Sequence, residues 1–339
     1  MSIKRLLKIL SVACCGGFLL SMQPTAGHAQ TKIVMSNDNS ALGLKGKTFD
    51  LFKSDIEKRL GGKVVVEMHH SGTLFNQKTQ LQGVQLGSAN FIAPGFGTFA
   101  SLSKNINLLA IPFLLPSPDA IDEAIEDPLV RNAIMPDLER KNLAIVGVWM
   151  NGPRDISSRS QTPILAPDDM KGIKIRVQPA PVDIKTMQAF GANVVTIDWT
   201  EVPTAMQQGV IDAVEPTPNA LVGAGLPELI AQTTKVAYRF DFYLVATNKS
   251  WWDKLPSDVR DGIKAALKVA TKWNWENTEK ENLAAYAKLK AMGKKVYDLT
   301  PAQHKLWVDA VQPLWKQFGD DAVGPQVMDR LRAINAKYK

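Results

Sequence analysis

Cysteine is almost absent from this sequence, since only two occur in 339 residues. So few cysteines exclude a fold that is held together by disulfide bonds. Long hydrophobic runs are missing too, because the longest one in the interior of the chain, residues 108–116, is much shorter than the roughly 20 residues of a membrane-spanning helix. The sequence therefore excludes both a disulfide scaffold and a protein with several membrane spans.

The motifs of metal and nucleophilic chemistry are also missing. His69 and His70 are neighbours in a predicted strand and so point to opposite faces, and the sequence contains no His-Glu-x-x-His motif. It contains no Gly-x-Ser-x-Gly sequence either. Gly95-Phe96-Gly97 lacks the third glycine of a dinucleotide fingerprint and the lysine of a phosphate-binding loop. We therefore expect neither a metal nor a cofactor.

The first 29 residues have the layout of a secretory signal peptide. Residues 4–8 form a basic start, residues 9–20 are apolar, and residues 27–29 form a small-x-small cleavage site. We expect cleavage after residue 29 and a mature protein in the periplasm. Lipid attachment at Cys14 or Cys15 is a lesser alternative, because the apolar run continues past both.

Net charge falls once this segment is removed. The full chain has 40 Lys+Arg against 33 Asp+Glu. Residues 1–29 hold three basic residues, no acidic residue and both cysteines, so the mature chain keeps 37 basic residues and no cysteine. Nucleic-acid-binding proteins usually have basic residues clustered on one face, whereas the mature chain is nearly balanced in charge. We therefore expect no nucleic-acid partner.

Strand and helix patterns alternate twice along the chain. In the first half, strands are predicted at 31–36, 63–68, 90–93 and 143–150, with helices at 49–60, 79–87 and 121–138 between them. The second half repeats the pattern, with strands at 173–177, 194–197 and 211–215 and helices at 182–190 and 200–208. This alternation is typical of doubly wound α/β domains.

The remaining segments link the two units. Residues 235–247 form a long extended run. Residues 257–292 predict a helix of about 50 Å, which exceeds one small domain and so is expected to span both. The tail, residues 301–339, predicts one or two further helices.

Two arginines are candidates for anion binding. Arg154 follows a predicted strand end, and Arg176 lies within the apolar strand 173–177. One interpretation of Arg176 is a solvated basic strand face. The other is a guanidinium held rigidly over a cleft, where its planar fork would match a carboxylate.

Other candidates are equally open at this level. Trp199, at a strand–helix junction, is either core or a ligand wall, and Trp149 is a further possible contact. Glu215 ends a strand, which is where open α/β sheets bind ligands, or it is a simple surface acid. The Gly95-Phe96-Gly97 segment is either a turn or a loop whose backbone N–H groups face a ligand.

Several segments, in order and spacing, resemble one known family. They are residues 163–178, 189–192, 199–202 and 205–215, supported by residues 82–87, 111–114, 248–249, 252 and 255–256. The chain is similar to the periplasmic solute-binding proteins of the tripartite ATP-independent periplasmic (TRAP) transporters, of the C4-dicarboxylate-binding type. The resemblance covers nearly the whole mature chain.

The resemblance implies roles for particular residues. Arg176 occupies the position of the family's carboxylate-binding arginine, Arg154 that of a second ligand arginine, and Trp199 that of an aromatic residue that packs on the ligand. The family's ligand-binding asparagine after Glu215 is replaced by Pro216.

Further positions follow from the same comparison. Because that asparagine is absent, Glu215, Thr217 or Asn219 is expected to substitute for it. Arg239 falls near a ligand position in the hinge strand. Asn37, after the first strand, and Phe96, in the glycine loop, complete the candidate set.

The fold implied is two doubly wound α/β lobes joined by hinge strands, with a long helix across both. Lobe I would hold residues 30–151 and about 243–282, and lobe II residues 152–242 and about 283–339. The function implied is capture of a small carboxylate by cleft closure, without catalysis, and its delivery by a monomer to TRAP permease subunits in the membrane. The alternatives are a binding protein of an ATP-driven importer and a secreted enzyme. The sequence does not identify the carboxylate.

Overall fold

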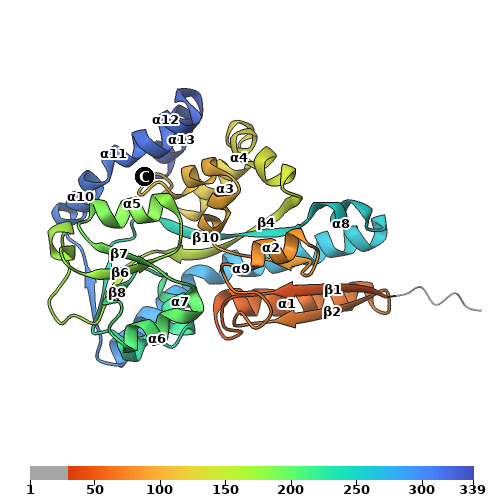
Figure 1. Ribbon diagram of the computed structural model, residues 1–339, viewed down its shortest axis with the longest axis horizontal. Coiled ribbons are helices and arrows are strands. Elements are labelled where there is room, and N and C mark those ends of the chain that lie inside the picture. Colours follow the sequence, from red (N-terminus) through yellow and green to blue (C-terminus); the bar gives the residue numbers. More distant parts are fainter. Residues whose placement is uncertain (1–29) are drawn as a thin grey trace, which may run out of the picture.

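Two β-sheets, each covered by helices, make up the described part of the molecule, as Figure 1 shows. The structure is a computed structural model that describes residues 30–339. The predicted signal peptide, residues 1–29, and its cleavage site therefore lie outside the described residues. No helix within residues 30–339 combines the length and the apolar character needed to cross a membrane.

The first sheet, with the helices on it, is called lobe I below. Its five strands lie in the order β2-β1-β3-β10-β4. β1 is parallel to β2 and β3, whereas β10 is antiparallel to β3 and β4. Its elements are β1 (Thr31–Ser36), α1 (Leu44–Leu60), β2 (Val64–His69), α2 (Gln80–Gln85), β3 (Phe91–Ile92), η1 (Phe96–Ser101), η2 (Lys104–Ala110), α3 (Pro118–Glu126), α4 (Pro128–Arg140), β4 (Leu143–Pro153), β10 (Phe240–Asn248) and α8 (Lys249–Lys254).

Both faces of this sheet are buried. The neighbours Trp149 and Met150 of β4 belong to different core clusters, as the alternation of side chains along a strand requires. Trp149 packs with Phe49 and Phe52 of α1, and Met150 packs on the side of α3 and α4. The helical spacing of Phe49, Phe52 and Ile56 thus places the apolar face of α1 on the sheet.

The second sheet and its helices are called lobe II. Its six strands lie in the order β11-β9-β5-β8-β6-β7, with β6 parallel to β7 and β8. Its elements are β5 (Ile156–Ser158), η3 (Pro167–Met170), β6 (Lys174–Val177), α5 (Pro181–Ala189), β7 (Asn193–Thr196), η4 (Trp199–Glu201), α6 (Val202–Gln207), β8 (Ala213–Val214), α7 (Pro218–Gly223), η5 (Leu226–Leu229), β9 (Gln232–Lys235) and β11 (Lys295–Asp298).

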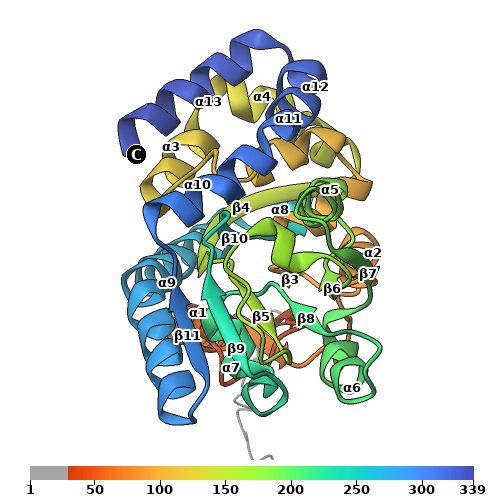
Figure 2. The ribbon, with the colours of Figure 1, turned by 90° about the vertical axis from the view of Figure 1, so that its left-hand side faces the viewer.

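Within residues 30–339, three chain segments connect the lobes at the hinge, and the C-terminal tail also crosses from lobe II to lobe I. The first is the link from β4 to β5, the second is the link from β9 to β10, and the third is α9 (Ser257–Ala291). The first two segments are joined directly, because the backbone N–H of Arg154 donates to the carbonyl oxygen of Arg239 at 3.0 Å. α9 contacts α1 and β4 of lobe I and α7 and β11 of lobe II (Figure 2). Its 35 residues confirm the long helix predicted from the sequence.

Two sequence predictions need correction. The single helix predicted over 121–138 is two helices, because Pro128 starts a new one and the Asp127 side chain accepts hydrogen bonds from the backbone N–H groups of Leu129 and Val130. The extended run over 235–247 is also interrupted. It leaves one sheet at Lys235 and enters the other at Phe240.

The C-terminal tail, for which the sequence predicted one or two helices, folds into a longer series of helical elements. They are α10 (Pro301–Ala310), α11 (Gln312–Trp315), η6 (Lys316–Asp320), α12 (Asp321–Val323) and α13 (Pro325–Tyr338). α10 and α11 pack on lobe II, whereas α13 packs on α3 and shares a core cluster with lobe I. This contact of the tail with lobe I was not expected from the sequence. The boundaries of the lobes stay a prediction.

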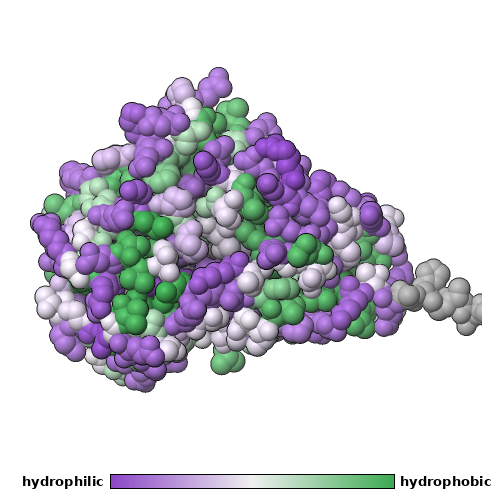
Figure 3. Space-filling view, viewed as in Figure 1, coloured by the Kyte–Doolittle hydropathy of each residue, from purple (hydrophilic) through white to green (hydrophobic). Residues whose placement is uncertain are grey.

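The surface is mixed in character. Figure 3 shows hydrophobic residues in small groups among hydrophilic ones on the face in view. Leu42 and Leu86, the most exposed of the large hydrophobic side chains in residues 30–339, come from different parts of lobe I. Scattered exposure of this kind is ordinary for folded proteins.

Candidate functional site

A cavity lies where the two lobes meet, and residues of both form its wall. Its volume is about 40 Å³. Lobe I contributes segments after β1 and β3, and lobe II contributes β6, η4 and the segment after β8. The lining residues are mostly polar or charged: Asp38, Asn39, Lys45, Gln77, Gly95, Asn151, Arg154, Arg176, Gln178, Trp199, Pro216, Thr217, Ala220, Asp241 and Tyr243.

Arg176 reaches this cavity from β6 and is only 2% exposed. Its Nε and Nη2 donate to the carbonyl oxygen of Ile197 at 3.2 and 3.0 Å, and Nη2 also donates to Oε1 of Gln77 in lobe I at 2.7 Å. The guanidinium lies 5.3 Å from the ring centre of Trp199. These partners are uncharged, and within residues 30–339 no carboxylate pairs with Arg176. Burial lowers its pKa to about 10.

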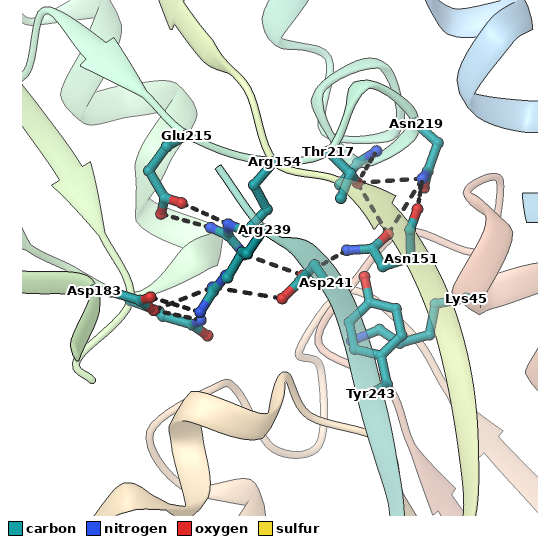
Figure 4. Close-up of polar contacts among 12 residues, drawn as sticks. Lys45, Asn151, Arg154, Asp183, Glu215, Thr217, Asn219, Arg239, Asp241 and Tyr243 are labelled. Atoms are coloured by element: carbon teal, nitrogen blue, oxygen red, sulfur yellow. Dashed lines mark hydrogen bonds and ion pairs between the residues drawn. The ribbon is translucent and has the colours of Figure 1, made fainter. Parts of the chain in front are cut away.

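Arg154, in contrast, is fully paired. Its Nε and Nη2 donate to the two carboxylate oxygens of Glu215, each at 2.5 Å, and its Nη1 donates to Oδ2 of Asp241 at 3.1 Å (Figure 4). Burial opposes the charge of Arg154, but Glu215 and Asp241 outweigh it and raise its pKa above the usual range. Two residues predicted to bind a ligand thus bind each other. Arg154 lines the cavity, and Glu215 lies behind it and also accepts a hydrogen bond from the Tyr238 hydroxyl.

Arg239 lies behind the cavity wall. Its Nη1 is 2.6 Å from Oδ1 of Asp183, an ion pair by distance whose angle is not that of a hydrogen bond, while Nη2 donates to Oδ2 at 3.3 Å. Nη2 also lies 3.5 Å from Oδ1 of Asp241. The guanidinium covers the ring of Phe96, which stacks on Phe242 in the core. Neither Arg239 nor Phe96 lines the cavity.

A network of side-chain amides and one hydroxyl links the hinge segments on the side of the cavity near α7 and α9. The Thr217 hydroxyl donates to Oδ1 of Asn151 at 3.0 Å, and the Asn219 amide donates to the Asn151 carbonyl oxygen at 2.6 Å. Asn282 of α9 joins both segments, because its amide donates to the Asn151 carbonyl oxygen and its oxygen accepts from Asn219. Thr217 lines the cavity, and Asn219 lies beside it.

Lobe I contributes a charged pair that sequence reasoning missed. Nζ of Lys45, in α1, donates to Oδ1 of Asp38 at 2.5 Å and to the carbonyl oxygen of Ala93 at 3.2 Å. It also lies 4.2 Å from the ring centre of Tyr243. Burial lowers the pKa of Lys45, although Asp38 acts against that shift. In the sequence, Lys45 looks like any solvated lysine of an amphipathic helix, so no local signal identifies it.

The two tryptophans named as candidates lie in different places, one at the cavity and one in the core. Trp199 lines the cavity beside Arg176. Trp149 is fully buried in the core of lobe I, where its indole N–H donates to the Thr271 hydroxyl at 3.0 Å. The interpretation of Trp149 as a ligand contact was therefore wrong, because the pleat of β4 turns its side chain to the core. Asn37 is also away from the cavity, and its amide donates to the carbonyl oxygen of Asn39 at 2.8 Å.

The glycine loop brings the lobes together. A Cβ atom on Gly97 would lie 2.8 Å from Cβ of Ala180 and 3.0 Å from the Gln178 amide, and one on Gly95 would lie 2.9 Å from Oε1 of Gln178. Gln178 and Ala180 belong to the segment between β6 and α5 of lobe II. The missing side chains at residues 95 and 97 thus allow a close approach of lobe II.

Comparison with known proteins supplies the family. The family model for bacterial extracellular solute-binding proteins of family 7 (DctP) matches residues 35–321. This chain belongs to that family. It is 31% identical, over 86% of its length and 87% of the relative's, to the C4-dicarboxylate-binding periplasmic protein DctP of Vibrio cholerae. Within residues 30–339, no group of three or more His, Cys, Asp or Glu side chains could hold a metal ion.

Solved structures of relatives share the fold of this family 7 protein. A TRAP periplasmic solute-binding protein of Shewanella oneidensis with bound succinate has a TM-score of 0.86 and 27% identity, and the match covers 91% of this chain and all of that one. A TRAP protein of Pseudomonas aeruginosa with bound L-malate has a TM-score of 0.80 and 25% identity, over 85% of this chain and 99% of that one.

These matches decide between the interpretations of the sequence. The predicted two-lobed α/β fold is confirmed, and so is the prediction of a TRAP-type solute-binding protein that is not an enzyme. The binding protein of an ATP-driven importer and the secreted enzyme are set aside. The ligand-binding roles of the individual residues stay predictions.

Proposed function

We propose that this protein captures a small organic carboxylate between its lobes, with Arg176 as the principal anion-binding group. The proposal rests on one observation: Arg176 is a buried cation at the cavity, and no carboxylate among residues 30–339 pairs with it. A buried charge without a counter-charge is costly. A ligand carboxylate would supply that counter-charge.

The geometry also supports closure of the lobes around the ligand. Arg176 of lobe II donates to Gln77 of lobe I, and the backbone N–H of Lys78 in lobe I donates to Oδ2 of Asp198 in lobe II at 3.3 Å. These bonds join the two lobes across the cavity.

The binding energy that Arg176 can supply is limited. A hydrogen bond to a charged group contributes about 1.5–3 kcal/mol, whereas micromolar binding needs about 8 kcal/mol. Arg176 therefore supplies a large share of the affinity. Trp199, Thr217 and the closure contacts supply the rest.

The proposal includes a place and a partner. We expect the signal peptide to direct the chain to the periplasm, where the closed protein acts as a monomer and docks on TRAP permease subunits driven by an ion gradient. The family 7 assignment and the periplasmic relatives support this placement. Chromatography with light scattering on periplasmic extracts of an expressing strain would give the mass of the processed chain and its oligomeric state.

The test is a comparison of arginine variants. Succinate, malate, gluconate and glucuronate are first screened for an increase in melting temperature, because binding stabilises the folded state. Calorimetry with the best of them then compares the wild type with Arg176→Ala and Arg176→Lys. We expect both variants to lose at least about tenfold in affinity, since a lysine ammonium cannot form the planar two-bond contact. Arg140→Ala, at an exposed arginine, is the matched control. Unchanged affinity in Arg176→Lys would contradict the proposal.

A further inference from the structure

The four cations around the cavity differ in what neutralises them. Arg154 is neutralised by Glu215 and Asp241, Lys45 by Asp38, and Arg239 by Asp183. Arg176 has no such partner within residues 30–339. Three of the five N–H groups of Arg154 donate to carboxylates, so the charge of this arginine is already balanced before a ligand binds. Arg176 is therefore the cation of this group that can pair directly with a ligand carboxylate.

Two carboxylates in the cavity wall act against a second anion, because the lining cations Lys45 and Arg154 are already paired. Asp38 and Asp241 are both part of its wall. A second carboxylate on the ligand would approach these two carboxylates without an unpaired cation to balance it, and like charges placed side by side disfavour binding. A second ligand carboxylate could bind only if it displaced Glu215 or Asp38 from its cation.

The same wall is suited to hydroxyl groups. Asn39, Asn151, Thr217 and Tyr243 line it with uncharged amide and hydroxyl groups. Asn151 and Thr217 are bonded to each other, and Asn151 also donates to Asp241. Buried Oδ1 of Asp241 accepts no hydrogen bond from residues 30–339, although it lies 3.5 Å from Nη2 of Arg239. A ligand hydroxyl would supply such a donor without adding charge.

We infer that the ligand carries a single carboxylate, bound by Arg176, and that its far end is uncharged and hydroxylated, facing Asp38, Asp241 and Asn151. This inference rests on the proposed function and narrows its substrate class from carboxylates in general to hydroxylated monocarboxylates. Because Asp38 and Asp241 already pair with cations, a terminal ammonium on the ligand is not required either.

Two matched pairs of acids test the inference. In each pair the compounds differ only at the far end, which is a CH₂OH group in one and a carboxylate in the other: 2,3,4-trihydroxybutanoate against tartrate of the same configuration, and gluconate against glucarate. Calorimetry on the full mature chain should give an affinity at least about tenfold higher for the monocarboxylate of the pair whose length fits. Tighter binding of either dicarboxylate would overturn the inference, as would tighter binding of 4-amino-3-hydroxybutanoate than of trihydroxybutanoate.

Failure of the inference can be told apart from failure of the proposed function. If none of these compounds binds but another organic acid raises the melting temperature, the hydroxylated class is wrong and carboxylate capture stands. If no organic acid in the wider screen raises the melting temperature, both are wrong.

A variant tests whether the pairing of Arg154 is what excludes a second ligand carboxylate. Glu215→Gln removes the carboxylate that occupies two nitrogens of Arg154, so Arg154 becomes available to a second ligand carboxylate. The ratio of dicarboxylate to monocarboxylate affinity should rise at least about tenfold, and an unchanged ratio in the folded variant would contradict the charge argument. Glu228→Gln, at an exposed glutamate of the same lobe, is the matched control. Should Glu215→Gln fail to fold, the wild-type pairs still decide the question.

Discussion

The hydroxyl of Tyr286 donates a hydrogen bond to the carboxylate of Asp155 where the three lobe-connecting segments meet. Asp155 lies in the link from β4 to β5, Tyr286 in α9, and Ala237, whose backbone N–H donates to Oδ1 of Asp155 at 3.0 Å, in the link from β9 to β10. Lys235 and Asp298 are the other charged groups near this cluster. A single buried carboxyl thus ties the hinge together.

This carboxyl should make stability depend on pH. Burial raises the pKa of Asp155 to about 7, although the hydrogen bonds from Tyr286 and Ala237 act against that shift. Because the folded pKa lies above the unfolded one, the contribution of Asp155 is complete below about pH 4 and is lost as the pH rises toward about 7. At about 1.4 kcal/mol per pKa unit, the loss is on the order of 4 kcal/mol.

The variant Asp155→Asn tests this pH dependence, because asparagine cannot ionise. Relative to the wild type, the variant should gain stability as the pH rises from 5 to 8, as measured by urea unfolding at each pH. Asp168→Asn, whose side chain is 84% exposed, is the control and should keep a constant difference. Parallel stability curves for Asp155→Asn and the wild type would contradict the assignment of a buried, ionising carboxyl.

A second prediction concerns the glycine at the hinge. Gly152 has φ +123°, and a Cβ atom there would lie 2.2 Å from Nδ2 of Asn282. Gly152→Ala should therefore combine backbone strain of about 1–3 kcal/mol with overpacking of about 1–3 kcal/mol. Gly62→Ala is the comparison, because Gly62 also has a positive φ, +73°, but nothing within 4 Å of a Cβ.

The comparison of these two variants by urea unfolding decides the matter. Gly152→Ala should lose at least about 2 kcal/mol more than Gly62→Ala. An equal loss at the two positions would mean that the contact with Asn282 adjusts freely and does not fix the hinge strand.

The elements of this fold were largely predictable because their signals are local. Phe49, Phe52 and Ile56 at helical spacing, followed by Gly61, define α1 in the sequence, and the strand 31–36 has the predicted bounds. The break between α3 and α4 was missed because the apolar spacing continues across it, although Pro128 marked it. Apolar periodicity alone does not register a proline that starts a new helix.

The site was less predictable because its charges are set by tertiary contacts. Arg154 and Arg176 look alike in the sequence, yet Glu215 and Asp241 neutralise one and leave the other. Lys45 and Asp38 carry no local signal that separates them from surface charges. Which cation is free for a ligand depends on pairs brought together from distant segments, and only the folded chain shows these pairs.

The last prediction concerns lobe closure at the glycine loop. Gly97 lies in η1 of lobe I, and a Cβ atom there would be 2.8 Å from Cβ of Ala180, at the start of α5 in lobe II. Its backbone φ is not positive, so alanine is tolerated by the backbone itself. Gly97→Ala should therefore hold the lobes apart and weaken binding of the acid found in the melting screen by at least about tenfold, with little change in the stability of the ligand-free protein.

Adding Ala180→Gly removes the opposing methyl group, so the double variant should recover most of the affinity. Calorimetry and small-angle scattering with and without ligand would measure affinity and closure. A Gly97→Ala protein that binds and closes like the wild type would show that lobe II does not need this close approach, and a loss that Ala180→Gly fails to restore would assign the effect to Gln178 instead.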